Sequence, residues 1–257
     1  MKVAAYQAPF VDGSLTESIA LIAEQVRSCE SAGVEILCCP EGILGGLADY
    51  AARPADSAIH PQQLHAMLAP LASESVATIF GFTELEAGGR LFNSAAVVYQ
   101  GVVVGLYRKR YPAINRSVYA HGDDLPVFRV GHLTFGIVIC RDSTYPELIR
   151  LMVNRGAMVV FVPTNNGLPS ERFGPEVVEQ ARQTDVARAR ENGIWVIRSD
   201  VAGQIKGLVS YGSTSIVNPS GLVVHGAKPF EVGLLIAEIE TIENRSSQTL
   251  QPSSRAQ

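Results

Sequence analysis

The sequence predicts an α/β protein in which one mixed sheet, or two sheets, is covered by helices. Three observations predict this class. Short β-rich runs alternate with stretches of helical hydrophobic spacing along most of the chain. Some of the strands are linked through helices, which favours parallel pairing. Others are linked by short glycine turns, which are typical of antiparallel hairpins.

The predicted strands are rich in β-branched and aromatic residues and are bounded by turn residues. They cover residues 3–7, 35–39, 77–82, 94–99, 102–108, 133–139, 158–162, 194–199, 214–218 and 234–239. Glycine turns at residues 100–101 and 219–221 predict two hairpins.

The predicted helices separate several of these strands. Residues 15–32 have helical spacing, with Leu15, Ile19 and Ile22 on one face, and they end before Gly33, a good stop signal. Residues 61–73, 143–155 and 175–192 are also predicted to be helical. The last two are each followed by a glycine and a further strand.

The composition predicts one domain with a substantial core. The chain has 257 residues, of which 47% are hydrophobic and 18% charged, and no linker or repeat divides residues 1–243. Residues 244–257 form a polar tail, which we expect either to be disordered or to lie at an oligomer interface.

Charge and hydropathy exclude several classes of partner. The net charge is −4 and no block of lysine and arginine stands out, so we expect no nucleic-acid partner. No apolar run approaches the roughly 20 residues that span a bilayer, and the N-terminus lacks the features of a signal peptide. We therefore expect a cytoplasmic protein with no membrane partner.

Cysteine and histidine spacing predicts neither a metal site nor disulfides. Cys29, Cys38, Cys39 and Cys140 include no C-x-x-C pair, so all four are expected to be free thiols. The histidines lack a metal-ligand spacing. No glycine-rich phosphate loop is present, and we expect no cofactor.

Cys140 stands where the apolar run 133–139 stops and a predicted helix begins. Such a turn exposes a side chain at the end of a strand. Helix N-termini favour anions, so a thiol in this position can lose its proton well below the ~8.5 of a free cysteine. The segment alone leaves two alternatives open, a nucleophile or a small buried core residue.

Two further strand ends carry ionisable groups. Glu41 follows the strand 35–39, and Lys109 follows the strand 102–108. A carboxylate, an ammonium and a thiol supply the base, the cation and the nucleophile of acyl transfer. The alternatives for the first two are a loop residue and a solvated charge cluster.

The motifs around these residues resemble the nitrilase, or carbon–nitrogen hydrolase, superfamily. The segments that carry the resemblance are Pro40–Glu41, Gly81–Glu84, Asn93–Ala95, Tyr107–Lys109, Gly136–Cys140 with Asp142 and Tyr145–Leu148, Ala187–Asn192 and Gly212–Ser215. They follow the family's order, glutamate then lysine then cysteine. The similarity covers about residues 1–240.

The resemblance implies a fold and a set of roles. The fold is a four-layer α-β-β-α sandwich that forms a homodimer or a higher homo-oligomer. Glu41 is implied as the general base, Lys109 as the cation that stabilises the intermediate and Cys140 as the nucleophile. The backbone N–H of Arg141 is the implied oxyanion donor. Asp142 and Glu147 are expected to be structural, at the start of the helix.

The chain departs from the family pattern near the substrate. Many members carry a second glutamate between the lysine and the cysteine, and alignment back from Gly122 places Asn115 at that position. A slip of one residue would place Arg116 there instead. Asn can hydrogen-bond to a substrate but cannot take a proton.

Other polar residues are candidates for substrate contacts. Asn165 and Asn166 follow a predicted strand and could meet an amide, and Arg172 could grip a carboxylate. The alternative is a turn with one solvated arginine. Asp200 stands where relatives often have Asn, and it could simply hydrogen-bond within its loop.

The predicted function is hydrolysis of a small non-peptide amide, with release of ammonia or an amine. An N-carbamoyl hydrolase using the same three groups is the close alternative. A nitrilase is less favoured, because true nitrilases tend to follow the nucleophile with Trp-Glu, whereas this chain has Arg141 and Asp142. An alternative of another class is a catalytically weak binding or interaction protein on the same fold.

Overall fold

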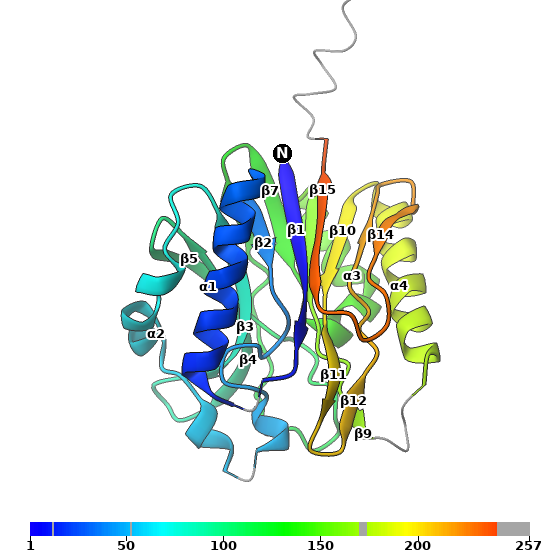
Figure 1. Ribbon diagram of the computed structural model, residues 1–257. Helices are drawn as coiled ribbons and strands as arrows, with labels where there is room; N and C mark the ends of the chain where they lie inside the picture. The colour runs from blue at the N-terminus through cyan, green and yellow to red at the C-terminus, as the bar shows by residue number, and fades with distance from the viewer. Residues whose placement is uncertain (12, 52, 170–173, 241–257) are drawn as a thin grey trace, which may run out of the picture.

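The computed structural model describes residues 1–11, 13–51, 53–169 and 174–240. The predicted tail 244–257 and Arg172 lie outside these residues. The described chain is an α/β fold in which two sheets lie face to face between two layers of helices (Figure 1). This arrangement confirms the predicted fold class.

The first sheet contains nine strands in the described part of the chain. Its main path runs β5-β4-β3-β2-β1-β11-β12-β9, and β15 also pairs with β1. β1 is parallel to β2, and β2 is parallel to β3, whereas β3, β4 and β5 form antiparallel pairs. The bounds are β1 Lys2–Pro9, β2 Ile36–Cys38, β3 Ala77–Leu85, β4 Leu91–Tyr99, β5 Val102–Arg108, β9 Leu168–Pro169, β11 Val201–Ile205, β12 Leu208–Ser210 and β15 Gly233–Glu238.

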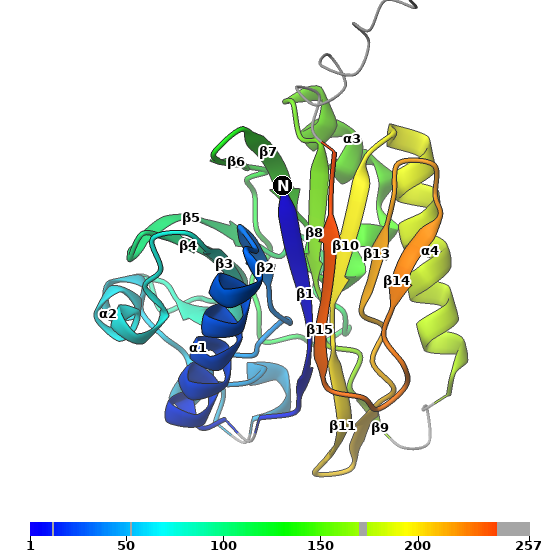
Figure 2. The ribbon, with the colours of Figure 1, turned by 45° about the horizontal axis from the view of Figure 1, so that its top comes forward.

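The second sheet has six strands in the order β14-β13-β10-β8-β7-β6. Its central strands β7, β8 and β10 are mutually parallel. The bounds are β6 Val127–Val130, β7 Leu133–Ile137, β8 Val159–Pro163, β10 Trp195–Ser199, β13 Ser215–Val217 and β14 Val223–Gly226. Figure 2 shows the two sheets edge-on, with β1 and β15 beside β8 and β10.

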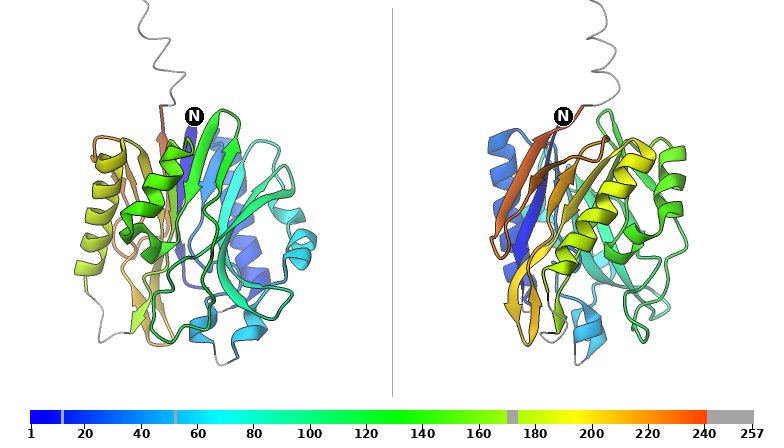
Figure 3. Two further views of the ribbon diagram at one scale, coloured as in Figure 1. Left: turned by 180° about the vertical axis from the view of Figure 1, so that it is seen from behind. Right: turned by 90° about the vertical axis from the view of Figure 1, so that its right-hand side faces the viewer.

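Helices cover the outer face of each sheet. α1 (Leu15–Ala32) and α2 (Pro61–Met67) cover the first sheet, whereas α3 (Pro146–Asn154) and α4 (Glu176–Asn192) cover the second (Figure 3). The Ser14 side chain caps α1 by accepting from the Glu17 N–H, and Gly33 ends the helix with a φ of 68°. None of the described helices is long and apolar enough to cross a membrane.

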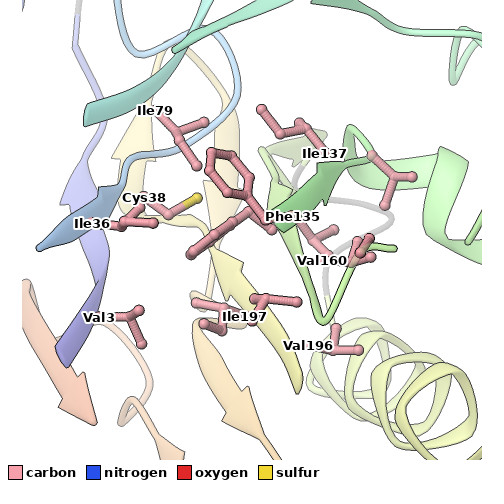
Figure 4. Packing of buried hydrophobic residues seen from close by; sticks show 14 of the residues in the cluster. Val3, Ile36, Cys38, Ile79, Phe135, Ile137, Val160, Val196 and Ile197 are labelled. Carbon is pink, nitrogen blue, oxygen red and sulfur yellow. The ribbon is translucent and has the colours of Figure 1, made fainter. Parts of the chain in front are cut away.

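The hydrophobic core lies in two parts, one between the sheets and one beneath α1 and α2. The inter-sheet part contains Val3, Ile36, Phe135 and Ile197, whose side chains meet in Figure 4. Cys38 belongs to this part, whereas Cys39 belongs to the part that packs against α1. Adjacent strand residues point to opposite faces, which explains why two neighbouring thiols lie in different cores.

The observed elements match most of the predicted ones, with two helices divided. The predicted helix 143–155 is wrong at its start, because Cys140–Thr144 forms a separate 3₁₀ turn, η4, and α3 begins at Pro146. A residue before proline avoids the α region, and Tyr145 is accordingly extended, with φ −99° and ψ 99°. The predicted helix 61–73 divides at Leu68 into α2 and η3 (Ala69–Leu71), which contains Pro70.

Candidate active site

The ends of strands from both sheets converge on one site. Glu41 follows β2 and Lys109 follows β5, both in the first sheet, while Cys140 follows β7 in the second. β5 runs in the same direction as β3 because each is antiparallel to β4. The carboxyl ends of β2 and β5 therefore lie at one edge of their sheet.

Glu41 and Lys109 form a buried ion pair. Lys109 Nζ lies 2.6 Å from Glu41 Oε1, and each side chain is 3% exposed. Asn93 Nδ2 donates to the same carboxylate oxygen at 2.7 Å, and the backbone N–H of Asn165 donates to Glu41 Oε2 at 2.9 Å. The carboxylate is thus held by donors from β4, from the end of β5 and from the loop after β8.

The charge of Lys109 is maintained by its neighbours. Burial alone would lower the pKa of Lys109, but the opposing charge of Glu41, the hydrogen bond to Glu41 and the charge of Asp142 raise it above its usual value. The side chain is therefore an ammonium at neutral pH.

Cys140 lies at a tight turn where η4 begins. Its φ is 47°, a left-handed conformation that non-glycine residues rarely adopt. Its Sγ lies 3.9 Å from Asn166 Oδ1, and its carbonyl oxygen accepts from Ser143 Oγ at 2.8 Å. The turn leaves Cys140 partly exposed, whereas Cys29, Cys38 and Cys39 are buried.

The predicted low pKa of the Cys140 thiol is wrong. Burial, together with the negative charge of Glu41, raises its pKa to about 12, against the lowering influence of Lys109 and Arg198. η4 is a single short 3₁₀ turn, so it supplies little helix dipole to offset this burial. The raised pKa favours the protonated thiol, so attack calls for a base that takes its proton.

Asp142 connects the lysine segment to the cysteine turn. Its carboxylate accepts from Tyr107 Oη at 2.6 Å, from the Tyr111 N–H at 2.8 Å and from the Arg110 N–H at 3.1 Å. Burial raises the pKa of Asp142, although these donors oppose the shift. The carboxylate lies within η4, so it fixes the segment around Lys109 against the turn of Cys140.

Arg141 follows the nucleophile within η4. The first N–H groups of a helical turn have no intrahelical acceptor, and the Arg141 N–H is in this position. The exposed side chain donates through Nη1 to the carbonyl oxygens of Pro112 and Ala113, each at 3.2 Å. The side chain thus connects η4 to the loop after β5.

The predicted polar contacts divide into two groups. Asn166 lies beside Cys140, whereas Asn165 holds Glu41 through its backbone and uses its Oδ1 to accept from the Gly167 N–H at 3.0 Å. Asn115 lies on the loop between β5 and β6 with an exposed side chain, and none of the hydrogen bonds described for Glu41 involves it.

Asn93 is a site residue to which the sequence assigned no role. It contacts Glu41 through its side chain, and its carbonyl oxygen accepts from the Lys109 N–H at 2.8 Å. The available signal was the position of Asn93 directly before the predicted strand 94–99, at the same end of the predicted hairpin as Lys109, which directly follows the strand 102–108. Pairing of β4 with β5 places the two side by side.

A cavity of about 560 Å³ shares two residues with the surroundings of Glu41, although Glu41, Lys109 and Cys140 themselves are not among its lining residues. Gly42 and Asn165, which adjoin Glu41 in sequence or by hydrogen bond, form part of its wall. Most of its side chains are apolar, and the ion pair of Arg53 and Asp56 also borders it. The apolar side chains that line it are those of Pro9, Phe10, Val11, Ile43, Leu47, Ala51, Val201, Ile205 and Leu208.

The described residues contain no group of three or more histidine, cysteine or acidic side chains that could hold a metal ion. The site is therefore built from a thiol, an ammonium, a carboxylate and amides.

Comparison with known proteins assigns the sequence to a family. The family described as carbon–nitrogen hydrolase matches residues 2–245. An (R)-stereoselective amidase from a Pseudomonas species is 29% identical over 237 residues, which are 90% of this chain and 82% of that protein. An N-carbamoylputrescine amidase from Solanum tuberosum is 28% identical over 60% of this chain and 57% of its own length.

Solved structures share the fold at lower identity. An amidase from Nesterenkonia sp. AN1, solved with acrylamide added to its active-site cysteine, has a TM-score of 0.78 at 21% identity and covers 97% of this chain and 100% of its own. A glutamine-dependent NAD⁺ synthetase from Acinetobacter baumannii has a TM-score of 0.82 at 20% identity. This chain spans only 48% of that synthetase.

Proposed function

Because the chain belongs to the carbon–nitrogen hydrolase family and is an enzyme acting on non-peptide C–N bonds, we propose that it hydrolyses a small amide through a thioester on Cys140. Glu41 is the proposed base, Lys109 the cation that stabilises the intermediate and Cys140 the nucleophile. The roles are carried by one observation. The buried Glu41–Lys109 ion pair lies at the same site as the Cys140 thiol, because Asn165 contacts Glu41 and Asn166 contacts Cys140.

The first half of the reaction forms the thioester. Glu41 takes the proton of Cys140 as Sγ attacks the amide carbon, and the carbonyl oxygen becomes an oxyanion near Lys109 and the Arg141 N–H. Glu41 then gives this proton to the amide nitrogen. The C–N bond breaks, and ammonia or an amine leaves while the acyl group stays on Sγ.

The second half of the reaction releases the acid. Glu41 takes a proton from a water molecule, whose oxygen attacks the thioester carbon. The C–S bond then breaks, and Glu41 returns the proton to the departing sulfur. The raised pKa of Cys140 explains why the carboxylate is needed in both halves, since the sulfur does not ionise by itself at neutral pH.

The neighbouring cavity supports a substrate with an apolar acyl group. Its wall shares Gly42 and Asn165 with the surroundings of Glu41, and most of its side chains are aliphatic or aromatic. Burial of such a group contributes about 25 cal/mol for each Å² removed from water. We propose that this cavity receives the acyl part of the amide.

Ammonia release from three substrate classes tests the proposed function. Matched aliphatic and aryl-substituted primary amides, N-carbamoyl amino acids and nitriles are incubated with the wild type and with Cys140→Ala. We expect release from the amides, with more apolar acyl groups favoured, and no release by C140A. Turnover only of N-carbamoyl compounds or nitriles would reassign the substrate. Inactivity of the folded wild type on all three classes would support the binding-protein alternative.

A further inference from the structure

Asp200 is a buried acid that accepts hydrogen bonds on both oxygens. Oδ1 accepts from the backbone N–H groups of Asn166 at 3.0 Å and Val201 at 2.8 Å. Oδ2 accepts from Asn166 Nδ2 at 3.0 Å and from the N–H and Oγ of Ser213 at 2.9 and 2.6 Å. Burial raises the pKa of Asp200, but every one of these partners is a donor, and a set of donors favours the carboxylate.

This carboxylate determines which way the Asn166 amide faces. A side-chain amide has a donor end and an acceptor end, whereas an ionised carboxylate only accepts. Asn166 Nδ2 therefore points to Asp200 and also donates to Ser213 Oγ at 3.0 Å. Its Oδ1 is left facing Cys140 Sγ, at 3.9 Å.

We infer that Asp200 makes the site selective for amides, by fixing Asn166 so that its Oδ1 accepts a hydrogen bond from the substrate's –NH₂ group. This inference rests on the proposed function. Asp200 is a positioning residue, since it acts through Asn166, and Asn166 is the group that touches the substrate.

Asn166 Oδ1 is placed to accept a hydrogen bond from the amide nitrogen that becomes the leaving group. In the tetrahedral adduct the amide nitrogen and Sγ are bonded to the same carbon, so an acceptor this close to Sγ is within reach of the N–H groups. The nitrogen gains a proton from Glu41 as the C–N bond breaks, and its hydrogen bond to Oδ1 becomes charge-assisted at that step. An ester has no N–H at this position and cannot use the interaction.

Asp200→Asn tests the inference with two substrates of one acid, a primary amide and its activated ester. The side-chain –NH₂ group introduced at position 200 faces the donor groups of Asn166 and Ser213. The Asn166 amide therefore no longer has one preferred orientation. By analogy with the loss of one transition-state hydrogen bond, we expect kcat for the amide to fall by about 10²-fold, with a smaller change in KM. The ester rate is expected to change by less than about threefold.

Ser210→Ala is the matched control, because it removes a buried hydrogen bond to the Gly212 N–H but is not a hydrogen-bond partner of Asp200 or Asn166. We expect its amide-to-ester ratio to equal that of the wild type. If D200N does not fold, Asn166→Ala carries the test and must show the same selective loss of amide turnover. Equal losses for amide and ester in D200N or N166A, or an unchanged ratio, would overturn the inference. A wild type that hydrolyses neither substrate refutes the proposed function itself.

Discussion

At the scale of single residues, the state of Cys140 differs from what the sequence indicates. A strand-to-helix turn predicts an activated thiolate, yet the short η4 turn and the nearby Glu41 keep the proton on sulfur. The sequence could not reveal the pKa of this thiol, because the burial of Cys140 and its distance to Glu41 depend on how the two sheets pack together. It did predict that Glu41 and Lys109 stand at strand ends, because each follows an apolar run directly.

Alkylation of Cys140 by iodoacetamide should therefore depend steeply on pH. With a pKa of about 12, the thiolate fraction increases about tenfold for each pH unit, so the rate should still be increasing between pH 7 and 10. Mass spectrometry of the digested protein measures the rate at each cysteine. A rate that levels off below pH 8 would show that the thiol is already ionised.

The buried thiols provide the internal control for this measurement. Cys29, Cys38 and Cys39 lie in the core and should stay unmodified while the protein is folded. Their modification before Cys140 would contradict the placement of the site.

At the scale of elements, the hydrogen bonds of Asp142 join the segment after β5 to η4. This bridge spans the two sheets and holds the lysine and cysteine segments in register. The sequence predicted a structural Asp142 but not its partners, since Tyr107 and Tyr111 come from another part of the chain. Proline at 146 also divided a helix that hydrophobic spacing alone made continuous.

Tyr107→Phe should weaken this bridge without changing the packing of the ring. Loss of a buried hydrogen bond to a charged acceptor costs about 1.5–3 kcal/mol, so the free energy of unfolding should fall by about that amount. We also expect kcat to decrease, because Lys109 is two residues away. Urea unfolding and amide hydrolysis measure the two effects.

Tyr99→Phe is the matched control, since Tyr99 lies at the opposite end of the hairpin formed by β4 and β5. It should have little effect on kcat. Equal losses in Y107F and Y99F would show that the bridge from Asp142 does not support catalysis.

At the scale of the whole molecule, each sheet contributes part of the site, and the core between the sheets sets their spacing. The sequence predicted the α/β class and most strands, because buried strands have continuous apolar runs and the hairpins carry glycine turns. The short strands β6, β9, β11, β12 and β14 are outside the predicted ranges, since two to five residues carry too little periodicity. Membership of the carbon–nitrogen hydrolase family, predicted from motifs, is confirmed.

We also propose that the chain forms a homodimer or a higher homo-oligomer. The resemblance to the carbon–nitrogen hydrolase family implies it, and Leu151 on α3, which is 43% exposed, offers a residue at which to test a contact through the outer layer of α3 and α4. Sedimentation velocity at micromolar concentration should give a mass at least twice the 27.6 kDa of one chain. Leu151→Glu should shift the protein toward monomer if this layer forms the contact. A wild type that sediments only as a monomer would contradict the proposal.

We propose that Cys140 carries the acyl group during hydrolysis. The most direct test is mass spectrometry of the wild type quenched with acid during turnover of a primary amide. We expect an added mass equal to that of the amide minus ammonia, located on the peptide that contains Cys140. We also expect no ammonia release by Cys140→Ala. An acyl group on another residue, or ammonia release by C140A, would contradict it.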